Sequence, residues 1–397
     1  SSNGLEKRPK LRFPGFDEPY KQCHIGDIYA ERSQRGASDM VLLSVTMNDG
    51  VIPRSEIEGK DNSSADKSNY KVVLMGDMVY NSMRMWQGAN GISPYDGIVS
   101  PAYTVLMPKI PISNGYFAAL FKSPNLINEF RKNSQGMTSD TWNLKYPQIE
   151  TIKVHIPPLS EQNRVADMLG TLERRIAKQA QLVENLKKYK RGVMQRIFRQ
   201  LPSQNGAEWT CVRLGDIFKK VSRRNTDGVI KNVITNSAEY GLIPQRDFFD
   251  KVIAVDGNTA NYYVIENGDF VYNPRKSNSA PYGPFNRYTL SEQGIISPLY
   301  TCLVLQADIS PSYLAWYFKS DAWYRYIYDN GSQGVRHDRV SMTDDLLMGI
   351  PVMYPSHVKQ LLYADILDMV EARLQATQKT LELLSKTRDG YMRQLFI

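Results

Sequence analysis

The sequence has few of the residues that build disulfide, zinc or membrane-spanning structures. Its 397 residues include only three cysteines, and their positions (Cys23, Cys211 and Cys302) form no CxxC motif. We therefore expect reduced thiols and no structural zinc site. No apolar run is long enough to cross a bilayer, and no charged-then-apolar leader is present. These absences favour a cytoplasmic protein without a membrane anchor.

Residues typical of catalysis are equally sparse. The four histidines, at positions 24, 155, 337 and 357, have no nucleophile or carboxylate at a consistent spacing. A P-loop is absent, and so is the Asn-Pro-Pro-aromatic motif of adenine methyltransferases, because Asn273 is followed by only one proline. Asp49 with Glu58-Gly59-Lys60 imitates a metal-binding acid pair plus lysine, but the second half of the chain lacks it, which favours a polar loop. We expect no catalytic residue and no metal site.

The charge is basic and uneven. Lys and Arg number 49 against 41 Asp and Glu, a surplus that fits a polyanionic partner without requiring one. Residues 1–198 hold 27 basic against 20 acidic side chains, whereas residues 199–397 hold 22 against 21. Phosphate contacts are therefore expected to matter more in the first half.

The clearest feature of the sequence is an internal duplication. Landmarks of the first half recur in the same order in the second half, and their offset grows slowly from 189 to 198 residues. The matches include Ile25-Gly26-Asp27-Ile28 with Leu214-Gly215-Asp216-Ile217, Gly76-Asp77-Met78-Val79-Tyr80-Asn81 with Gly268-Asp269-Phe270-Val271-Tyr272-Asn273, Phe121-Lys122-Ser123 with Phe318-Lys319-Ser320, and Met194-Gln195-Arg196-Ile197-Phe198 with Met392-Arg393-Gln394-Leu395-Phe396. Several matches in one order indicate a tandem repeat with small loop insertions.

Each repeat divides into a globular part and a long helix, so we predict an α+β fold. Short β-rich runs broken by Gly, Asn, Ser and Pro indicate a mixed α/β domain, and prolines close each globular part. One internal helix is expected in each domain, at residues 116–131 and 311–328. The predicted boundaries are an N-terminal arm at 1–20, a first domain at 21–157, a first helix at 158–200, a second domain at 201–352 and a second helix at 353–397.

Both long helices carry a narrow apolar seam. Steps of four and three from Val165 to Ile197, and from Tyr363 to Leu395, give eight apolar residues out of ten in each helix. Such a seam needs a partner helix, and we predict an antiparallel coiled coil of the two copies rather than packing on the globular parts. The predicted register sets Gln179 opposite Arg388 and Lys190 opposite Thr377. The predicted interface residues are Leu169, Leu172, Ile176, Gln179, Val183, Leu186, Lys190, Leu367, Val370, Leu374, Thr377, Leu381, Leu384 and Arg388.

Two similar domains joined by paired helices suit a ligand with two separate sites, and the basic surplus favours duplex DNA. At this point several motifs resemble the specificity subunit of Type I restriction-modification systems. They are Pro9-Lys10-Leu11-Arg12-Phe13-Pro14-Gly15-Phe16, the two Gly-Asp-Ile starts, the Gly-Asp-Phe-Val-Tyr-Asn element, Ile156-Pro157-Pro158-Leu159-Ser160-Glu161-Gln162 and the closing Met-x-x-(Ile/Leu)-Phe. The second copy departs from the pattern at the start of its helix, around Pro351 and Pro355, which leaves the first residue of that helix open.

The resemblance implies two target recognition domains that read the halves of an asymmetric, interrupted DNA site. It further implies that the helices separate the domains and dock two adenine methyltransferase subunits, with restriction and translocation subunits as additional partners. S-adenosylmethionine, ATP and Mg would then belong to the partners, and this chain would hold no cofactor. The alternatives are a stand-alone DNA nuclease or methyltransferase and a structural repeat scaffold.

Candidate DNA-binding residues follow from the chemistry of base and phosphate recognition. The Gly-Asp-(Met/Phe)-Val-Tyr-Asn element is shared, but the residues after it diverge and include the side chains that read guanine and adenine. These candidates are Asn81, Ser82, Arg84 and Gln87 in the first copy and Asn273, Arg275, Lys276, Ser277 and Asn278 in the second. Phosphate contacts are expected at Arg32, Arg35, Arg223 and Arg224. A shared motif, formed by Ser134 and Gln135 and by Ser332, Gln333 and Arg336, is assigned to a phosphate contact or a tight turn.

Overall fold

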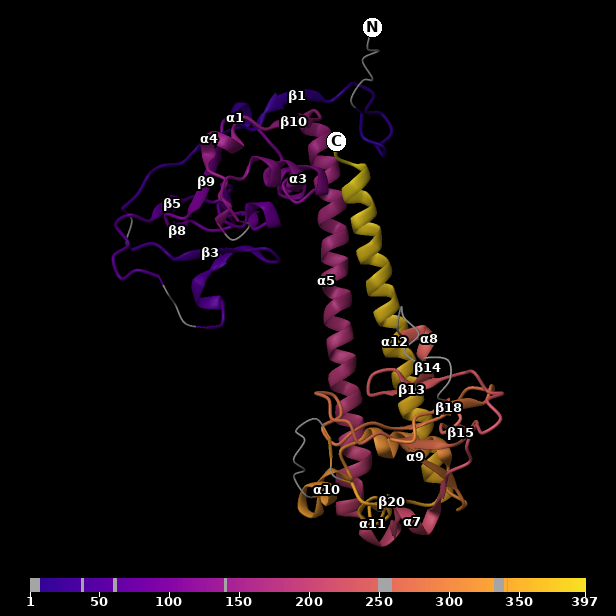
Figure 1. The fold of residues 1–397 in the computed structure, drawn as a ribbon. Coiled ribbons are helices and arrows are strands. Elements are labelled where there is room, and N and C mark those ends of the chain that lie inside the picture. The colour runs from indigo at the N-terminus through magenta and orange to yellow at the C-terminus, as the bar shows by residue number, and fades with distance from the viewer. Residues whose placement is uncertain are drawn as a thin grey trace. The chain divides into compact units, whose positions relative to one another are not determined.

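The computed structural model describes residues 8–36, 39–59, 63–138, 141–248, 259–331, 339–340 and 342–397. The chain forms two compact units, one made of Ser1–Gln181 with Gln378–Ile397 and the other of Leu182–Thr377. Each unit contains one globular domain and a part of each long helix (Figure 1). Each helix is thus shared between the units, whereas the sequence analysis had set the helices apart as separate segments.

The domain of the first unit is built on a four-stranded antiparallel sheet in the order β2-β9-β6-β7, with three further strand pairs, β1-β10, β3-β4 and β5-β8. Its elements are β1 (Lys21–His24), α1 (Ile25–Ile28), β2 (Tyr29–Glu31), β3 (Leu43–Thr46), β4 (Gly50–Pro53), η1 (Arg54–Glu56), β5 (Lys71–Val73), β6 (Met78–Asn81), η2 (Met85–Gln87), β7 (Asn90–Ile92), β8 (Gly97–Val99), β9 (Tyr103–Pro108), α2 (Asn114–Leu120), α3 (Pro124–Asn133), α4 (Tyr146–Ile149) and β10 (Lys153–Ile156).

The domain of the second unit repeats this topology strand for strand. Its four-stranded sheet has the order β12-β19-β16-β17, and the pairs β11-β20, β13-β14 and β15-β18 match those of the first domain. The elements are η5 (Gly206–Glu208), β11 (Thr210–Arg213), α7 (Leu214–Ile217), β12 (Phe218–Val221), β13 (Ile234–Ser237), β14 (Gly241–Pro244), α8 (Gln245–Phe248), β15 (Tyr263–Ile265), β16 (Phe270–Tyr272), β17 (Phe285–Arg287), β18 (Gly294–Ile296), β19 (Thr301–Leu305), α9 (Pro311–Lys319), α10 (Tyr324–Asn330), α11 (Asp344–Met348) and β20 (Pro351–Tyr354). The predicted duplication is therefore confirmed.

The shared Gly-Asp-(Met/Phe)-Val-Tyr element forms β6 and β16, the buried strands of the two sheets. Side chains of a strand alternate between its faces. Met78 and Tyr80 accordingly join the core cluster that includes α2 and α3, while Val79 joins a smaller cluster with β3 and β4. In the second domain Phe270 and Val271 divide between the corresponding clusters. Because each face of the strand packs against a core cluster, the strand carries apolar or aromatic side chains on both faces.

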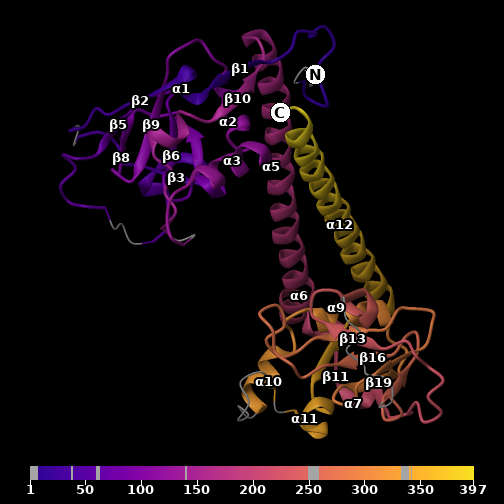
Figure 2. The same cartoon turned by 45° about the horizontal axis from the view of Figure 1, so that its top comes forward.

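The single helix predicted in each domain is wrong, because each is two helices. In the first domain α2 ends at Leu120 and α3 begins at Pro124, with the hydroxyl of Ser123 accepting a hydrogen bond from the amide of Leu126. Pro124 disfavours a helical conformation in Ser123, so the chain breaks there and restarts with a cap. In the second domain the break falls between α9 and α10. Figure 2 shows α2 and α3 on the side of the first domain that faces α5.

The long helices are α5 (Leu159–Gln195), which continues into a π-helical turn, η4 (Arg196–Gln200), and a short helix, α6 (Leu201–Gln204), and α12 (His357–Gln394). The second helix begins at His357 and not at residue 353, because β20 extends to Tyr354 and completes the second domain. Leu159 and His357 are 198 residues apart, so both helices start at equivalent positions. No helix among the described residues is long and apolar enough to cross a membrane.

Within each unit the two helices pack in opposite directions, as predicted. In the first unit Arg388 of α12 pairs with Glu173 of α5, and the last turn of α12 lies at the start of α5, beside Arg12. In the second unit Lys190 of α5 pairs with Glu371 of α12. All twenty predicted seam positions are buried or partly buried, from Val165 to Ile197 and from Tyr363 to Leu395. The narrow apolar stripe therefore faces inward along its full length.

The predicted register is wrong. We expected Arg388 to face Gln179 and Lys190 to face Thr377, but their charged partners are Glu173 and Glu371, each six residues away along the other helix. At about 1.5 Å per residue the difference is roughly 9 Å, close to one heptad. The basic seam residues choose acidic partners beside the seam, and the hydroxyl of Thr377 is satisfied by the carbonyl of Arg373 in its own helix.

Each domain is fixed to its helix by a buried glutamine. The side chain of Gln162 accepts a hydrogen bond from the amide of Ser113 and donates one to the carbonyl of Pro157. Gln360 makes the same two bonds, to Ser310 and Pro355. The helix starts of the two copies thus share this glutamine, although their sequences looked different around the prolines.

Candidate nucleic-acid interface

The loop after β6 is a compact turn with three outward side chains. The side-chain oxygen of Asn81 accepts a hydrogen bond from the amide of Met83, and Gly88 ends η2 with a positive φ of 89°. Met85 is fully buried, and Trp86 packs edge-to-face on Trp142. The loop is therefore held from below, and the exposed side chains are Met83, Arg84 and Gln87.

The loop after β16 begins with the same turn. Asn273 accepts a hydrogen bond from the amide of Arg275 at 3.0 Å, as Asn81 does in the first copy. Buried asparagines then hold the loop, since Asn236 donates to the carbonyl of Val271 and accepts from Asn286. Beyond the turn the two loops differ in sequence and length. The exposed side chains in this loop are Arg275, Ser277, Asn278 and Ser279, and Lys276 is half-buried.

Three of the predicted DNA contacts are buried or are bonded to a buried group within their domains. Ser82 is buried, with its hydroxyl 2.8 Å from that of Thr104. Asn273 is buried in the turn just described, and its side-chain amide also donates to the carbonyl of Asn236. Arg32 donates two hydrogen bonds to the carboxylate of Asp77, which is itself buried. We leave these three residues out of the proposed interface.

The remaining basic candidates lie at the surface. Arg35 and Arg224 occupy equivalent places. Arg35 forms a β-bridge with Lys71, the first residue of β5, and its guanidinium donates a hydrogen bond to the carbonyl of Asn69. Arg224 forms a β-bridge with Tyr263, the first residue of β15, and its guanidinium donates to the side-chain oxygen of Asn261. Both side chains are exposed. Arg223 is also exposed but is paired with Glu266 at 2.6 Å. Arg35 and Arg224 are thus the best placed of the predicted phosphate contacts.

The Ser-Gln-Gly motif of the first copy follows α3 and contains one side of a β-bridge. The hydroxyl of Ser134 donates to the carbonyl of Phe130 at the end of α3, and Gln135 exchanges backbone hydrogen bonds with Asn143. Gly136 has a φ of 153°, and an added Cβ would lie 2.7 Å from the carbonyl oxygen of Thr141. The backbone therefore needs glycine there. Ser332, Gln333 and Arg336 lie outside the described residues.

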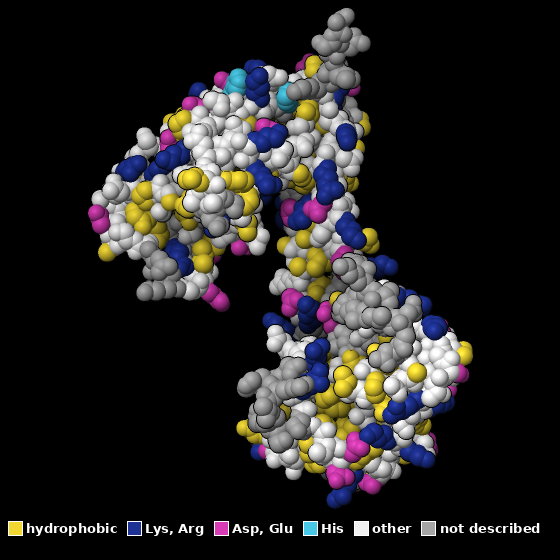
Figure 3. Space-filling model, viewed as in Figure 1, with side chains coloured by type: hydrophobic (Ala, Val, Ile, Leu, Met, Phe, Trp, Pro, Cys, Tyr) yellow, Lys and Arg dark blue, Asp and Glu magenta, His cyan; other side chains and the backbone are white. Residues whose placement is uncertain are grey.

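On the face shown in Figure 3, Lys and Arg side chains are scattered among acidic and hydrophobic ones instead of forming one basic stripe. The candidate interface is therefore identified from the loops after β6 and β16, because the distribution of charge on this face does not mark it. Within the described ranges, no group of three or more His, Cys, Asp or Glu side chains is placed to hold a metal ion.

One feature was not predicted from the sequence, a cavity of about 840 Å³ in the first unit beside Lys122, Glu173 and Arg388. A comparison of the two copies could have indicated this cavity, because the first copy has the small residue Ala119 at the position of Trp316 in the second. No residue pattern in the first copy alone marks this place.

Comparison with known proteins shows a similarity to proteins of restriction systems. Residues 34–188 match the profile of the Type I restriction modification DNA specificity domain. A curated protein of Methanocaldococcus jannaschii, named as the type I restriction enzyme MjaX specificity subunit, is 21% identical over 280 residues. That alignment spans 57% of this chain and 64% of the relative, less than two thirds of its length.

Solved structures share the fold over nearly the whole chain. The S subunit of a Type I restriction-modification system from M. genitalium is 14% identical with a TM-score of 0.57, and 98% of this chain and 99% of that chain are covered. The HsdS subunit from Thermoanaerobacter tengcongensis is 16% identical with a TM-score of 0.50, covering 98% of both. A structure concerned with complex assembly and conformational transition of the type I R-M system is 16% identical with a TM-score of 0.56, covering 97% and 98%.

Proposed function

We propose that this chain, which is similar to the specificity subunits of Type I restriction-modification systems, reads a bipartite, asymmetric DNA site and performs no catalysis itself. Each globular domain reads one half of the site. The two halves differ because the reading loops differ, while the scaffold that carries them is the same.

A single observation supports this proposal most strongly. The strands β6 and β16 end in the same asparagine-capped turn, at Asn81 and Asn273, and the exposed side chains beyond the turns are different. A strand and turn shared by both copies, followed by loops with different exposed side chains, is the arrangement expected of two domains that bind different DNA sequences. Two identical loops would favour a palindromic site.

The exposed loop residues have the chemistry of base recognition. Arg84 and Gln87 in the first loop suit guanine and adenine, and Arg275 and Asn278 in the second loop suit the same two bases. Arg35 and Arg224 supply phosphate contacts that position each domain without reading sequence. The interface thus separates into reading loops and positioning arginines.

The helix pair is the proposed docking surface for two adenine methyltransferase subunits, with restriction and translocation subunits joining them. Large apolar side chains remain exposed on the helices away from the seam, which is typical of interaction surfaces. They include Leu182 and Tyr189 on α5 and Met369 and Leu383 on α12. S-adenosylmethionine, ATP and Mg would be bound by those partners.

The decisive experiment maps methylated adenines in cells that carry this chain and its methyltransferase partner. We expect one bipartite motif. Arg84→Ala with Gln87→Ala should alter one half of the motif only, and Arg275→Ala with Asn278→Ala should alter the other half only. Lys153→Ala, an exposed lysine on β10 outside both loops, should leave the motif unchanged.

Two results would contradict the proposal. If both loop variants changed the same half, or neither changed any base, the loops would not be the readers. Methyl transfer or DNA cleavage by the purified chain alone would instead support the alternative of a stand-alone methyltransferase or nuclease.

A further inference from the structure

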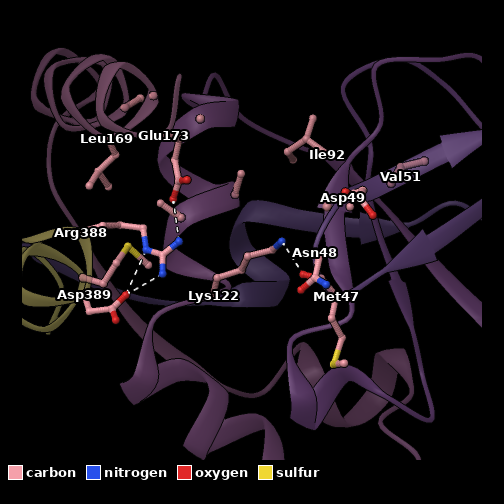
Figure 4. A pocket seen from close by; sticks show the side chains of 18 of the residues that line it. Met47, Asn48, Asp49, Val51, Ile92, Lys122, Leu169, Glu173, Arg388 and Asp389 are labelled. Atoms are coloured by element: carbon pink, nitrogen blue, oxygen red, sulfur yellow. Dashed lines mark hydrogen bonds and ion pairs between the residues drawn. The ribbon is translucent and has the colours of Figure 1, made fainter. Parts of the chain in front are cut away.

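The first unit contains a cavity of about 840 Å³ where its domain meets the helices. Figure 4 shows the residues around it, with Lys122 reaching from the end of α2 toward the turn before β4, where its ammonium donates to the carbonyl of Met47. Arg388 lies across the cavity and pairs with Glu173 and Asp389. Apolar side chains, among them Val51, Ile92, Leu169 and Met392, complete the lining.

The second unit has a cavity at the equivalent place, but its volume is only about 190 Å³. Several residues of its lining stand at positions equivalent to residues that line the first cavity. Lys319 corresponds to Lys122, and Glu371 to Glu173. Lys190 corresponds to Arg388.

Two substitutions between the copies explain the difference in volume. Trp316 fills the second cavity, and the residue at its position in the first copy is Ala119. The indole nitrogen of Trp316 donates to Asp368 at 2.8 Å, and the residue at the position of Asp368 in the first copy is Gly170. The first copy therefore lacks both the aromatic ring and its hydrogen-bond acceptor.

The residues around Trp316 show which kind of side chain the second cavity holds. The ammonium groups of Lys319 and Lys190 lie 4.8 Å and 5.2 Å from the centre of its ring system, within the range of cation–π contacts. The tryptophan is 4% exposed and belongs to the main core cluster of its domain. A planar, electron-rich ring in contact with two cations thus occupies this place in the second unit.

We propose that the cavity of the first unit receives an aromatic side chain from a partner protein, inserted where Trp316 lies in the second unit. Lys122 and Arg388 take the places of the two lysines that flank Trp316. The inference rests on the proposed function, because the partner we assign is the methyltransferase subunit that assembles with this chain.

Charge and size favour a protein side chain over a nucleotide. The cavity is lined by Lys122, Arg388 and Arg393 but also by Asp49, Glu173 and Asp389, so it offers no excess of positive charge for phosphate. Its volume exceeds that of one aromatic ring and leaves room for the peptide on either side of the ring. Large aromatic side chains that enter such pockets are the usual anchors of protein interfaces.

The cavity is tested first with free indole, which is the side chain of tryptophan. Purified full-length protein should bind indole saturably, as followed by ligand-detected NMR, and Ala119→Trp should abolish that binding by filling the space. Ala119→Ser, which keeps the space open, should bind as the wild type does. Trp316→Ala should add a second indole site in the second unit.

The occupant is tested by assembly with the methyltransferase subunit. Ala119→Trp should weaken that association at least tenfold, Ala119→Ser should not, and excess indole should weaken the wild-type complex. Association that is unchanged by Ala119→Trp and by indole would overturn the proposal, as would wild-type protein that binds no indole. The methylated motif separates a failure of this inference from a failure of the proposed function. If only the cavity inference is wrong, the Ala119→Trp protein should still assemble with the methyltransferase and methylate the same two half-sites as the wild type. If the proposed function is wrong, the wild-type complex should show no bipartite motif.

Discussion

Lys190 of α5 donates a hydrogen bond to Glu371 of α12 across 2.6 Å. Burial alone would raise the pKa of the Glu371 carboxyl, but the hydrogen bond and the charge of Lys190 outweigh burial, so its pKa lies below the usual value. The same pair recurs as Arg388 with Glu173. A basic seam residue and an acidic neighbour thus hold the helices together in each unit.

This pair predicts a pH dependence of stability. A carboxyl with a lowered pKa in the folded state stabilises the fold above its unfolded pKa, and that contribution disappears as the pH falls through the folded pKa. Glu371→Gln should therefore lower the free energy of unfolding by on the order of 0.5 kcal/mol at pH 7, because the pair is partly exposed. The difference from wild type should begin to shrink as the pH falls below about 4.3, the usual pKa of glutamic acid, and should be smaller still at lower pH, as measured by urea unfolding across pH 3–7. A difference that grows toward low pH would refute the assignment.

Removal of Arg12 should be far more damaging. Its guanidinium donates two hydrogen bonds to Glu161, at 2.9 Å and 2.8 Å, and Glu161 is fully buried at the start of α5. Arg12→Met would leave a buried carboxylate without its cation, which costs about 3–5 kcal/mol. Chemical denaturation followed by circular dichroism should show this loss.

The second copy supplies the control for Arg12. Lys359 occupies the position of Glu161 and pairs with Glu208 at the surface, so the charges are reversed and exposed to water. Lys359→Met should leave the unfolding midpoint nearly unchanged. Equal losses for the two variants would show that burial of Glu161 is not the cause.

Arg35 and Arg32 should differ in their effect on DNA binding although they are three residues apart. Arg35→Ala should reduce the slope of log affinity against log salt by about one unit, because an exposed phosphate contact is lost. Arg32→Ala should leave that slope unchanged and instead destabilise the domain, since Arg32 is bonded to buried Asp77. Salt titrations of the assembled complex compare the two variants, and a reduced slope for Arg32→Ala alone would reverse the assignment.

The three thiols should react with iodoacetamide in a defined order. Burial raises the pKa of the Cys302 thiol to about 12, and burial also raises the pKa of Cys23. Cys211 is exposed. We expect mass spectrometry of the native protein at pH 8 to find Cys211 modified first and Cys302 modified only after unfolding. Rapid modification of Cys302 in the native state would contradict its place in the core.

The architecture could be predicted from sequence because a repeat is visible without any structure. Each landmark that recurs, such as Gly76-Asp77 and Gly268-Asp269, marks the same place in both domains, and the structure repeats the sheet order to match. The pairing of the two long helices could also be predicted, since a narrow apolar stripe along a helix is usually buried against a second helix.

The details that failed depend on contacts between distant segments. The register was assigned by pairing Lys190 and Arg388 with polar seam residues, but an ion pair with a neighbouring glutamate is stronger than contact with a hydroxyl or an amide. The break at Pro124 was visible in the sequence and was outweighed by the helical spacing of the apolar residues. That Arg32 and Ser82 are occupied within the domain could not be read, because their partners lie 45 and 22 residues away.

One short contact gives the repeat a topological meaning. In the first unit the amide of Leu11 donates to the carbonyl of Gln394 at 3.0 Å, and the corresponding positions in the second unit, Gln200 and Arg196, both lie in the continuous chain of η4. This hydrogen bond and η4 thus mark two equivalent junctions between the repeats, the first bridged by a hydrogen bond and the second by continuous chain. A circular permutant that is linked at the first junction and opened near Asn205 should adopt the same fold with the order of its domains exchanged.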